Sequence, residues 1–206
     1  MRLRTYCGWM AAAALLLGCA GAPSDEALRA QAAETMKASF KPRGQADLSR
    51  LDQDETQRVC SLYAGKPLPR DVAQKIEAQN LATIKYPAGG KLLGDWKNGE
   101  KIAQEGRGKQ YSDDPRGPVG GNCYACHKLT ASELSYGTIG PSLYQFGKLR
   151  GYTDETRRYA YGKVYNAEAF AACSNMPRFG HNGILSEQQI RDVVALLMDP
   201  QSPVNQ

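Results

Sequence analysis

One short run constrains this chain more than any other feature: Cys123-Tyr124-Ala125-Cys126-His127. Two cysteines separated by two residues and followed at once by a histidine are typical of a covalent c-type haem attachment site. The two thiols add to the haem vinyl groups, and the adjacent imidazole lies under the iron as its proximal ligand. We therefore predict one covalently bound haem c, held by Cys123 and Cys126, with His127 on the iron. The alternative is a zinc knuckle, which usually needs a second Cys-x-x-Cys pair, and the sequence has no such pair.

The first residues have the pattern of an export signal, because two arginines precede a short apolar stretch from Cys7 to Leu17. That stretch is too short to span a bilayer. The run Leu16-Leu17-Gly18-Cys19 has the form of a lipobox, so we predict a signal peptide over residues 1–18 and lipidation of Cys19. This would give a periplasmic protein with a lipid anchor. Cleavage at the small residues near Ala22 is the alternative, and it would give a soluble periplasmic protein.

The charge balance argues against a nucleic-acid partner. The chain has 26 Lys and Arg against 21 Asp and Glu, and two of the arginines belong to the predicted signal peptide. The remaining charges are scattered rather than collected in blocks, so no basic patch is indicated.

The hydrophobic pattern indicates an all-α protein. A helix before the haem motif and a helix at the C-terminus are the arrangement of class I cytochromes c, and Ser186 with Gln189 forms a capping box that starts the second of these helices. We predict that Asn98 caps the first. The predicted domains are a helical N-terminal extension over 19–90, a cytochrome c domain over 91–202 and a tail over 203–206. The predicted helices are Ala27–Phe40, Asp47–Tyr63, Pro69–Ile84, Gly99–Gly108 and Ser186–Met198.

An iron bound by His127 has a sixth coordination position that a second side chain fills or that stays open. We favour Met176, because the proline that follows it restricts the backbone beside the thioether and helps to position a weak ligand. His181 and an open position are the alternatives, and Met176 as mere filling of the haem crevice is a third. Met36 lies in the extension, and Met198 lies on the last turn of the terminal helix, where packing is its expected role. Histidine and methionine together keep the iron low-spin and suit electron transfer.

Three further features bear on the site. The run Gly140-Pro141-Ser142-Leu143 resembles the Gly-Pro-x-Leu turn that class I cytochromes c place behind the proximal histidine, so we expect a backbone carbonyl at Pro141 to accept the other imidazole N–H; an ordinary turn is the alternative. Cys60 and Cys173 are left over, either as reactive thiols or, as an oxidising compartment favours, as a disulfide that holds the methionine loop. Arg178 and Phe179, beside Met176, are the predicted rim of the exposed haem edge.

The chain resembles the SoxX family, the small cytochrome subunits of the SoxAX complex of bacterial sulfur oxidation. The resemblance rests on Gly121-Asn122-Cys123-x-x-Cys126-His127, on Gly137-Thr138-Ile139-Gly140-Pro141-Ser142-Leu143 and on Asn175-Met176-Pro177-Arg178-Phe179-Gly180. It covers roughly residues 91–202. It implies His127 and Met176 as axial ligands, and Cys123 and Cys126 as covalent anchors.

The resemblance also implies partners and a reaction. The expected partners are a SoxA-type haem subunit, a SoxYZ-type carrier protein and a downstream electron-accepting cytochrome. In that family, SoxA and SoxX together join thiosulfate oxidatively to a cysteine of the carrier protein, which is an L-cysteine S-thiosulfotransferase reaction. The catalytic cysteine would belong to the SoxA-type subunit. This chain would then only transfer electrons. The main alternative is a free or membrane-tethered electron shuttle with no thiosulfate role. A haem peroxidase or gas sensor would need an exchangeable sixth position, against which Met176 argues.

Overall fold

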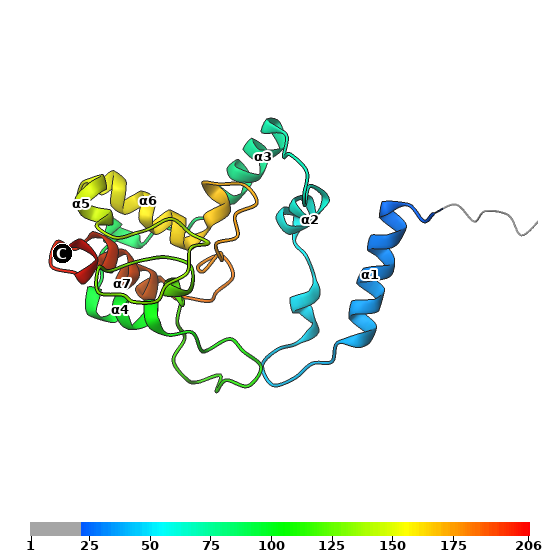
Figure 1. Ribbon diagram of the computed structural model, residues 1–206, viewed down its shortest axis with the longest axis horizontal. Coiled ribbons are helices and arrows are strands. Elements are labelled where there is room, and N and C mark those ends of the chain that lie inside the picture. The colour runs from blue at the N-terminus through cyan, green and yellow to red at the C-terminus, as the bar shows by residue number, and fades with distance from the viewer. Residues whose placement is uncertain (1–21) are drawn as a thin grey trace, which may run out of the picture. The chain divides into compact units, whose positions relative to one another are not determined.

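The computed structural model describes residues 22–206, and every regular element in this range is a helix or a short 3₁₀ turn (Figure 1). An isolated bridge between Arg43 and Ala46 is the one β-type pairing among the described residues. The all-α prediction is thereby confirmed. Within 22–206, no helix combines the length and the apolar content needed to cross a membrane. Cys19 and the predicted signal peptide lie outside the described residues. The chain divides into two compact units, one ending at Lys41 and the other formed by Pro42–Gln206.

The first unit contains α1 (Asp25–Ser39), close to the predicted bounds. The Ser24 side chain caps it by accepting the N–H of Ala27 at 3.2 Å, and two acidic residues lie in the first turn, where they complement the helix dipole. No residue of α1 is buried. Capping and an alanine-rich sequence therefore account for this helix without a hydrophobic face.

The second unit is organised around two closely packed helices, α4 (Trp96–Gln104) and α7 (Glu187–Met198), which lie next to each other in Figure 1. Gly99 allows the close approach, because a Cβ at this position would lie 2.1 Å from the backbone oxygen of Asp192 and 3.0 Å from Cβ of Leu196. Any larger residue on this face of α4 would push the helices apart. The predicted pairing of a helix before the haem motif with the C-terminal helix is therefore present.

The ends of these two helices test the capping predictions. The Ser186–Gln189 capping box of α7 is confirmed, with both reciprocal hydrogen bonds formed. The prediction that Asn98 caps α4 is wrong: the Asp95 side chain accepts the N–H of Lys97 at 2.9 Å, and the helix starts at Trp96. The helix also ends at Gln104 rather than near residue 108, where Gly108 has a φ of +111° that no helical residue adopts.

Two helices that the hydrophobic pattern did not indicate complete the core. α5 (Phe146–Arg150) is a single short helix, and α6 (Asp154–Tyr165) packs against α7. Thr153 caps α6 by accepting the N–H of Thr156 at 3.2 Å. The buried face of α6 includes Tyr161, which is fully buried. Its tyrosines and glycine give little apolar periodicity, so the helix carries a weak sequence signal.

The segment before the haem domain differs from its prediction. A single helix over 47–63 is wrong: a 3₁₀ turn at Leu48–Leu51 is followed by α2 (Glu55–Leu62). Asp54 forms a capping box with Gln57, and a capping residue has extended backbone, here with ψ of 175°. The chain must therefore leave the helical conformation before α2 begins.

Residues 42–90 pack onto the haem domain. Asn80 of α3 (Arg70–Leu81) donates to Thr56 Oγ1 at 2.9 Å, and buried Asn166 donates to Asn80 Oδ1 at 2.9 Å. Buried side-chain amides with satisfied hydrogen bonds fix one arrangement of the packed elements. The predicted division at residue 90 thus does not coincide with the division between the compact units, which falls after Lys41.

Candidate functional site

The haem motif is a tight 3₁₀ turn, Cys123–Ala125, entered through a left-handed residue. Asn122 has φ of +45°, which asparagine tolerates better than most residues. The N–H of Cys126 donates to the Cys123 carbonyl at 3.1 Å, and the N–H of His127 donates to the same carbonyl at 2.9 Å. This turn brings both thiols and the imidazole onto one short, folded segment. Neither cysteine belongs to a disulfide, and both are half-buried.

His127 is held by its second ring nitrogen. The residue is 9% exposed, and Nδ1 lies 2.7 Å from the Pro141 carbonyl oxygen. A neutral imidazole donates from one nitrogen only, so this hydrogen bond places the proton on Nδ1 and leaves the lone pair of Nε2 free to bind a metal. The structure thus places Pro141 where the sequence-based hypothesis puts it, behind the proximal histidine.

Glycines let the loop that follows approach the motif. The N–H of Gly137 donates to the Tyr124 carbonyl at 2.9 Å, and the N–H of Gly140 donates to the Cys126 carbonyl at 2.9 Å. A Cβ on Gly140 would lie 2.2 Å from Cε1 of His127, and one on Gly137 would lie 1.7 Å from the Ala125 oxygen. The loop therefore fixes the orientation of the imidazole.

Met176 lies on a segment without a helix, residues 171–180, which we call the methionine loop. Its side chain is half-buried and packs against the same hydrophobic core as Cys123 and Tyr124. Its N–H donates to Ser174 Oγ at 3.2 Å. Met176 as the sixth ligand remains a prediction, and its placement beside the core that carries the haem motif suits that role.

The other predicted candidates lie elsewhere. Met198 is fully buried in α7 and belongs to the hydrophobic core. Met36 is on α1, in the first unit. His181 is exposed as a whole residue, and partial desolvation of its ring, together with the charge of Arg178, lowers its pKa. The structure therefore gives none of these three the half-buried loop position that Met176 has.

The predicted haem-edge rim is wrong. Arg178 and Phe179 are each only 7% exposed. Phe179 belongs to the core, and the Arg178 guanidinium turns to the Asp54 carboxylate, with 2.5 Å between Nη2 and Oδ2. From the sequence alone, an arginine beside Met176 is expected on the surface. Arg178 is buried instead, and its ion-pair partner is Asp54, which lies 124 residues away in the chain.

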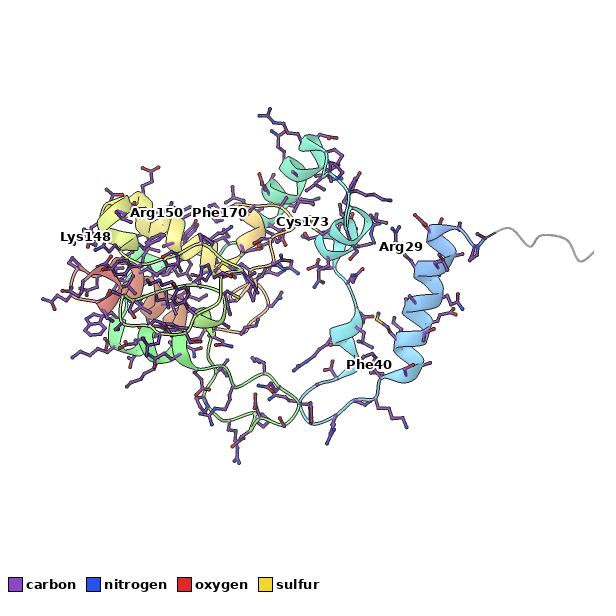
Figure 2. All side chains as sticks on the ribbon, in the orientation of Figure 1. Arg29, Phe40, Lys148, Arg150, Phe170 and Cys173 are labelled. Atoms are coloured by element: carbon purple, nitrogen blue, oxygen red, sulfur yellow. A yellow bond between two sulfur atoms is a disulfide. The ribbon has the colours of Figure 1, made fainter. Side chains whose placement is uncertain are left out.

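Cys60 and Cys173 form a disulfide, with 5.4 Å between their Cα atoms. The bridge joins α2 to the methionine loop; Cys173 is labelled in Figure 2. Neither residue is a free reactive thiol in this structure. Cys19, the lipidation candidate, lies outside the described residues.

The surroundings of Cys123 fit a covalent haem better than a metal–thiolate site. Burial raises the pKa of the Cys123 thiol to about 12, which marks an apolar environment around the sulfur. A thiol that adds to a vinyl group becomes an uncharged thioether, which tolerates an apolar site, whereas a zinc thiolate must be charged. Around Gly121, a Cβ would meet Cys123 Sγ at 3.3 Å, Phe179 at 3.6 Å and Leu185 at 3.7 Å. Within residues 22–206, no group of three or more His, Cys, Asp or Glu is assembled to hold a metal ion.

The Cytochrome c family model matches residues 97–199, half of the chain, including the haem motif, the Pro141 turn and the methionine loop. This chain belongs to the cytochrome c family. The haem c of this cytochrome c is therefore covalently bound, and its Cys-x-x-Cys-His run supplies the attachment. Along 193 residues it is 37% identical to a protein of Aquifex aeolicus (strain VF5) named as an uncharacterized lipoprotein, covering 89% of this chain and 90% of that protein. Electron transfer is the activity that goes with this family.

Proposed function

We propose that this cytochrome c is the small monohaem subunit of a SoxAX-type complex, which accepts electrons as thiosulfate is joined to a carrier cysteine. The observation that supports this most is the convergence of the three motifs that carry the resemblance. The loop 137–143 is hydrogen-bonded to the haem motif, and Cys123 of the motif and Met176 of the methionine loop pack against the same hydrophobic core as Phe179. The three motifs of the resemblance, which are widely spaced in sequence, thus lie around one site, as expected if all three serve the haem.

The chemistry divides between this chain and its partner. Joining thiosulfate to a carrier thiol forms one S–S bond, releases the thiol proton and removes two electrons. When bound, haem c supplies a one-electron redox centre. His127, with its Nδ1 proton held by Pro141, and Met176 would both hold the haem iron, so neither sulfur substrate would bind the iron here. The reacting sulfurs belong on the SoxA-type subunit, and electrons would pass to a downstream cytochrome.

We propose that Leu134 and Ile139, on the loop beside the haem motif, contact a partner subunit, which a free shuttle would not require. Leu134 is 100% exposed and Ile139 is 75% exposed. Both lie on the loop that is hydrogen-bonded to the motif through Gly137 and Gly140. Large apolar side chains exposed near a redox centre suit a stable interface with a partner protein. A shuttle that meets several partners briefly is expected to surround this region with charge instead.

We place the complex in the periplasm, anchored through lipidated Cys19. The lipobox at residues 16–19 supports this, as does the name of the Aquifex aeolicus relative. A c-type haem is also attached where thiols are handled in an oxidising compartment, which agrees with the Cys60–Cys173 disulfide.

Co-isolation from the native organism tests the proposal. The full chain, with an affinity tag at its C-terminus, is recovered from membrane and periplasmic fractions, and co-eluting proteins are identified by mass spectrometry. We expect a stoichiometric second haem protein with a cysteine-ligated haem. The matched control replaces Leu134 and Ile139 by serine, which should weaken the recovery of that protein and leave the haem spectrum unchanged. A lone redox-active monomer in every fraction would contradict the proposal and favour the electron shuttle.

A further inference from the structure

The methionine loop has no helix of its own, and α2 holds it on both sides of Met176. Three residues before Met176, Cys173 is bonded to Cys60 of α2. Two residues after it, Arg178 forms an ion pair with Asp54, the N-cap of α2. Two ties from a single eight-residue helix therefore bracket the predicted iron ligand.

The ion pair is the more unusual of the two ties. The Arg178 side chain is 8% exposed, whereas that of Asp54 is 40% exposed. A nearly buried guanidinium that loses its hydrogen-bonded carboxylate is costly, because the pair is broken while the charge stays in place. Asp54 uses its other oxygen, Oδ1, to accept the N–H of Gln57 at 2.9 Å. One carboxylate thus fixes both the start of α2 and the far side of the methionine loop.

Two further carboxylates hold the near side of the loop. Glu77 Oε1 of α3 accepts the N–H of Ala172 at 3.2 Å, and Glu168 Oε2 accepts the N–H of Cys173 at 2.6 Å. These bonds fix the backbone at the point where the disulfide arrives. Cys173 itself has φ of +60°, a left-handed conformation that a non-glycine residue adopts only when its surroundings impose it.

We propose that α2 is a clamp that positions Met176, with Asp54 and the Cys60–Cys173 disulfide as its two positioning elements. The proposal rests on Met176 as the iron ligand and is independent of the thiosulfate role. A thioether is a weak ligand, so the bond competes with the freedom of a loop that lacks regular structure. Holding the loop at both ends removes that freedom in advance and keeps the sixth position closed.

Ligation spectra of the full-length holoprotein test this clamp. Asp54→Asn keeps an oxygen for the N-cap and removes the charge that pairs with Arg178, so α2 should still form. Cys60→Ala/Cys173→Ala removes the other tie. Asp47→Asn is the matched control, because Asp47 caps the preceding 3₁₀ turn through Ser49. Readouts are the methionine–iron charge-transfer band of the ferric protein, carbon monoxide binding by the ferrous protein, and far-ultraviolet circular dichroism as a check of folding.

We expect wild type and Asp47→Asn to show the full band and no carbon monoxide adduct. Asp54→Asn should bind carbon monoxide at least about tenfold faster than wild type, since a broken buried pair loosens the loop, and the combined variant should lose the band. A full band without adduct in both folded clamp variants would overturn the clamp. Absence of the band from wild type would overturn the ligand assignment on which it rests. Neither result depends on whether a thiosulfate partner exists.

Discussion

Removing the Cys60–Cys173 disulfide should cost this cytochrome c a large part of its stability. The bridge joins residues 113 positions apart. In the chain-entropy model, a loop of that length lowers the entropy of the unfolded chain by about 16 cal/mol/K, which corresponds to about 5 kcal/mol at 25 °C. The thioether bonds to haem lie within four residues of each other, so they do not constrain this loop in the unfolded state. We therefore expect Cys60→Ala/Cys173→Ala to lose about 4–5 kcal/mol of unfolding free energy.

Guanidinium denaturation of the holoprotein, followed by circular dichroism and haem absorbance, measures this loss. A domain of this size should also melt roughly 10–20 °C lower. A matched variant, Cys60→Ala/Cys173→Gly, separates the cross-link from the backbone, because glycine relieves the left-handed conformation at position 173 and should recover about 1 kcal/mol. A loss below about 1 kcal/mol with an unchanged denaturant slope would refute the argument that the bridge acts on the unfolded chain.

Three other substitutions test particular contacts. Gly99→Ala places a Cβ 2.1 Å from the Asp192 backbone oxygen, so thermal unfolding should show a net loss of about 1–3 kcal/mol despite the better helix propensity of alanine. Gly140→Ala meets the His127 ring at 2.2 Å, so the holoprotein should show an altered reduction potential and low-spin spectrum, and an unchanged spectrum would contradict the packing. Burial raises the pKa of Glu168 above its ordinary 4.5, so the folded state binds the proton more tightly than the unfolded state. Stability should then fall as pH rises from about 4.5 through the raised pKa, and Glu168→Gln should flatten that part of a melting-temperature profile.

The parts of the fold that local signals determine could be predicted from the sequence. The Ser186 capping box and the apolar stripe after it define α7 without reference to the rest of the chain. The start of α4 shows the limit of this reasoning: Asn98 and Asp95 are both good N-caps, and Asp95 is the cap because its N–H is also held by Asp192 of α7 at 2.8 Å. Tertiary contacts decide between equivalent local choices.

The candidate site divides in the same way. The motif turn and the Pro141 carbonyl lie within twenty residues of one another, and their geometry follows from the local sequence. The burial of Arg178 depends on Asp54, 124 residues away, and no pattern near Met176 indicates it. Hydrophobic periodicity predicts local elements only. A contact between two residues far apart in the chain leaves no periodic pattern in either segment, so a single sequence cannot identify it.

The most direct test of the proposed function is the redox response of this cytochrome c to thiosulfate. The complex isolated from the native organism is oxidised, mixed with the reduced carrier protein, and followed by haem absorbance as thiosulfate is added. The account predicts that the haem of this chain becomes reduced only when thiosulfate and the carrier thiol are both present, with two electrons released per thiosulfate joined to the carrier. A haem that stays oxidised under these conditions, yet is reduced at once by dithionite, would contradict the thiosulfate role and leave an electron shuttle.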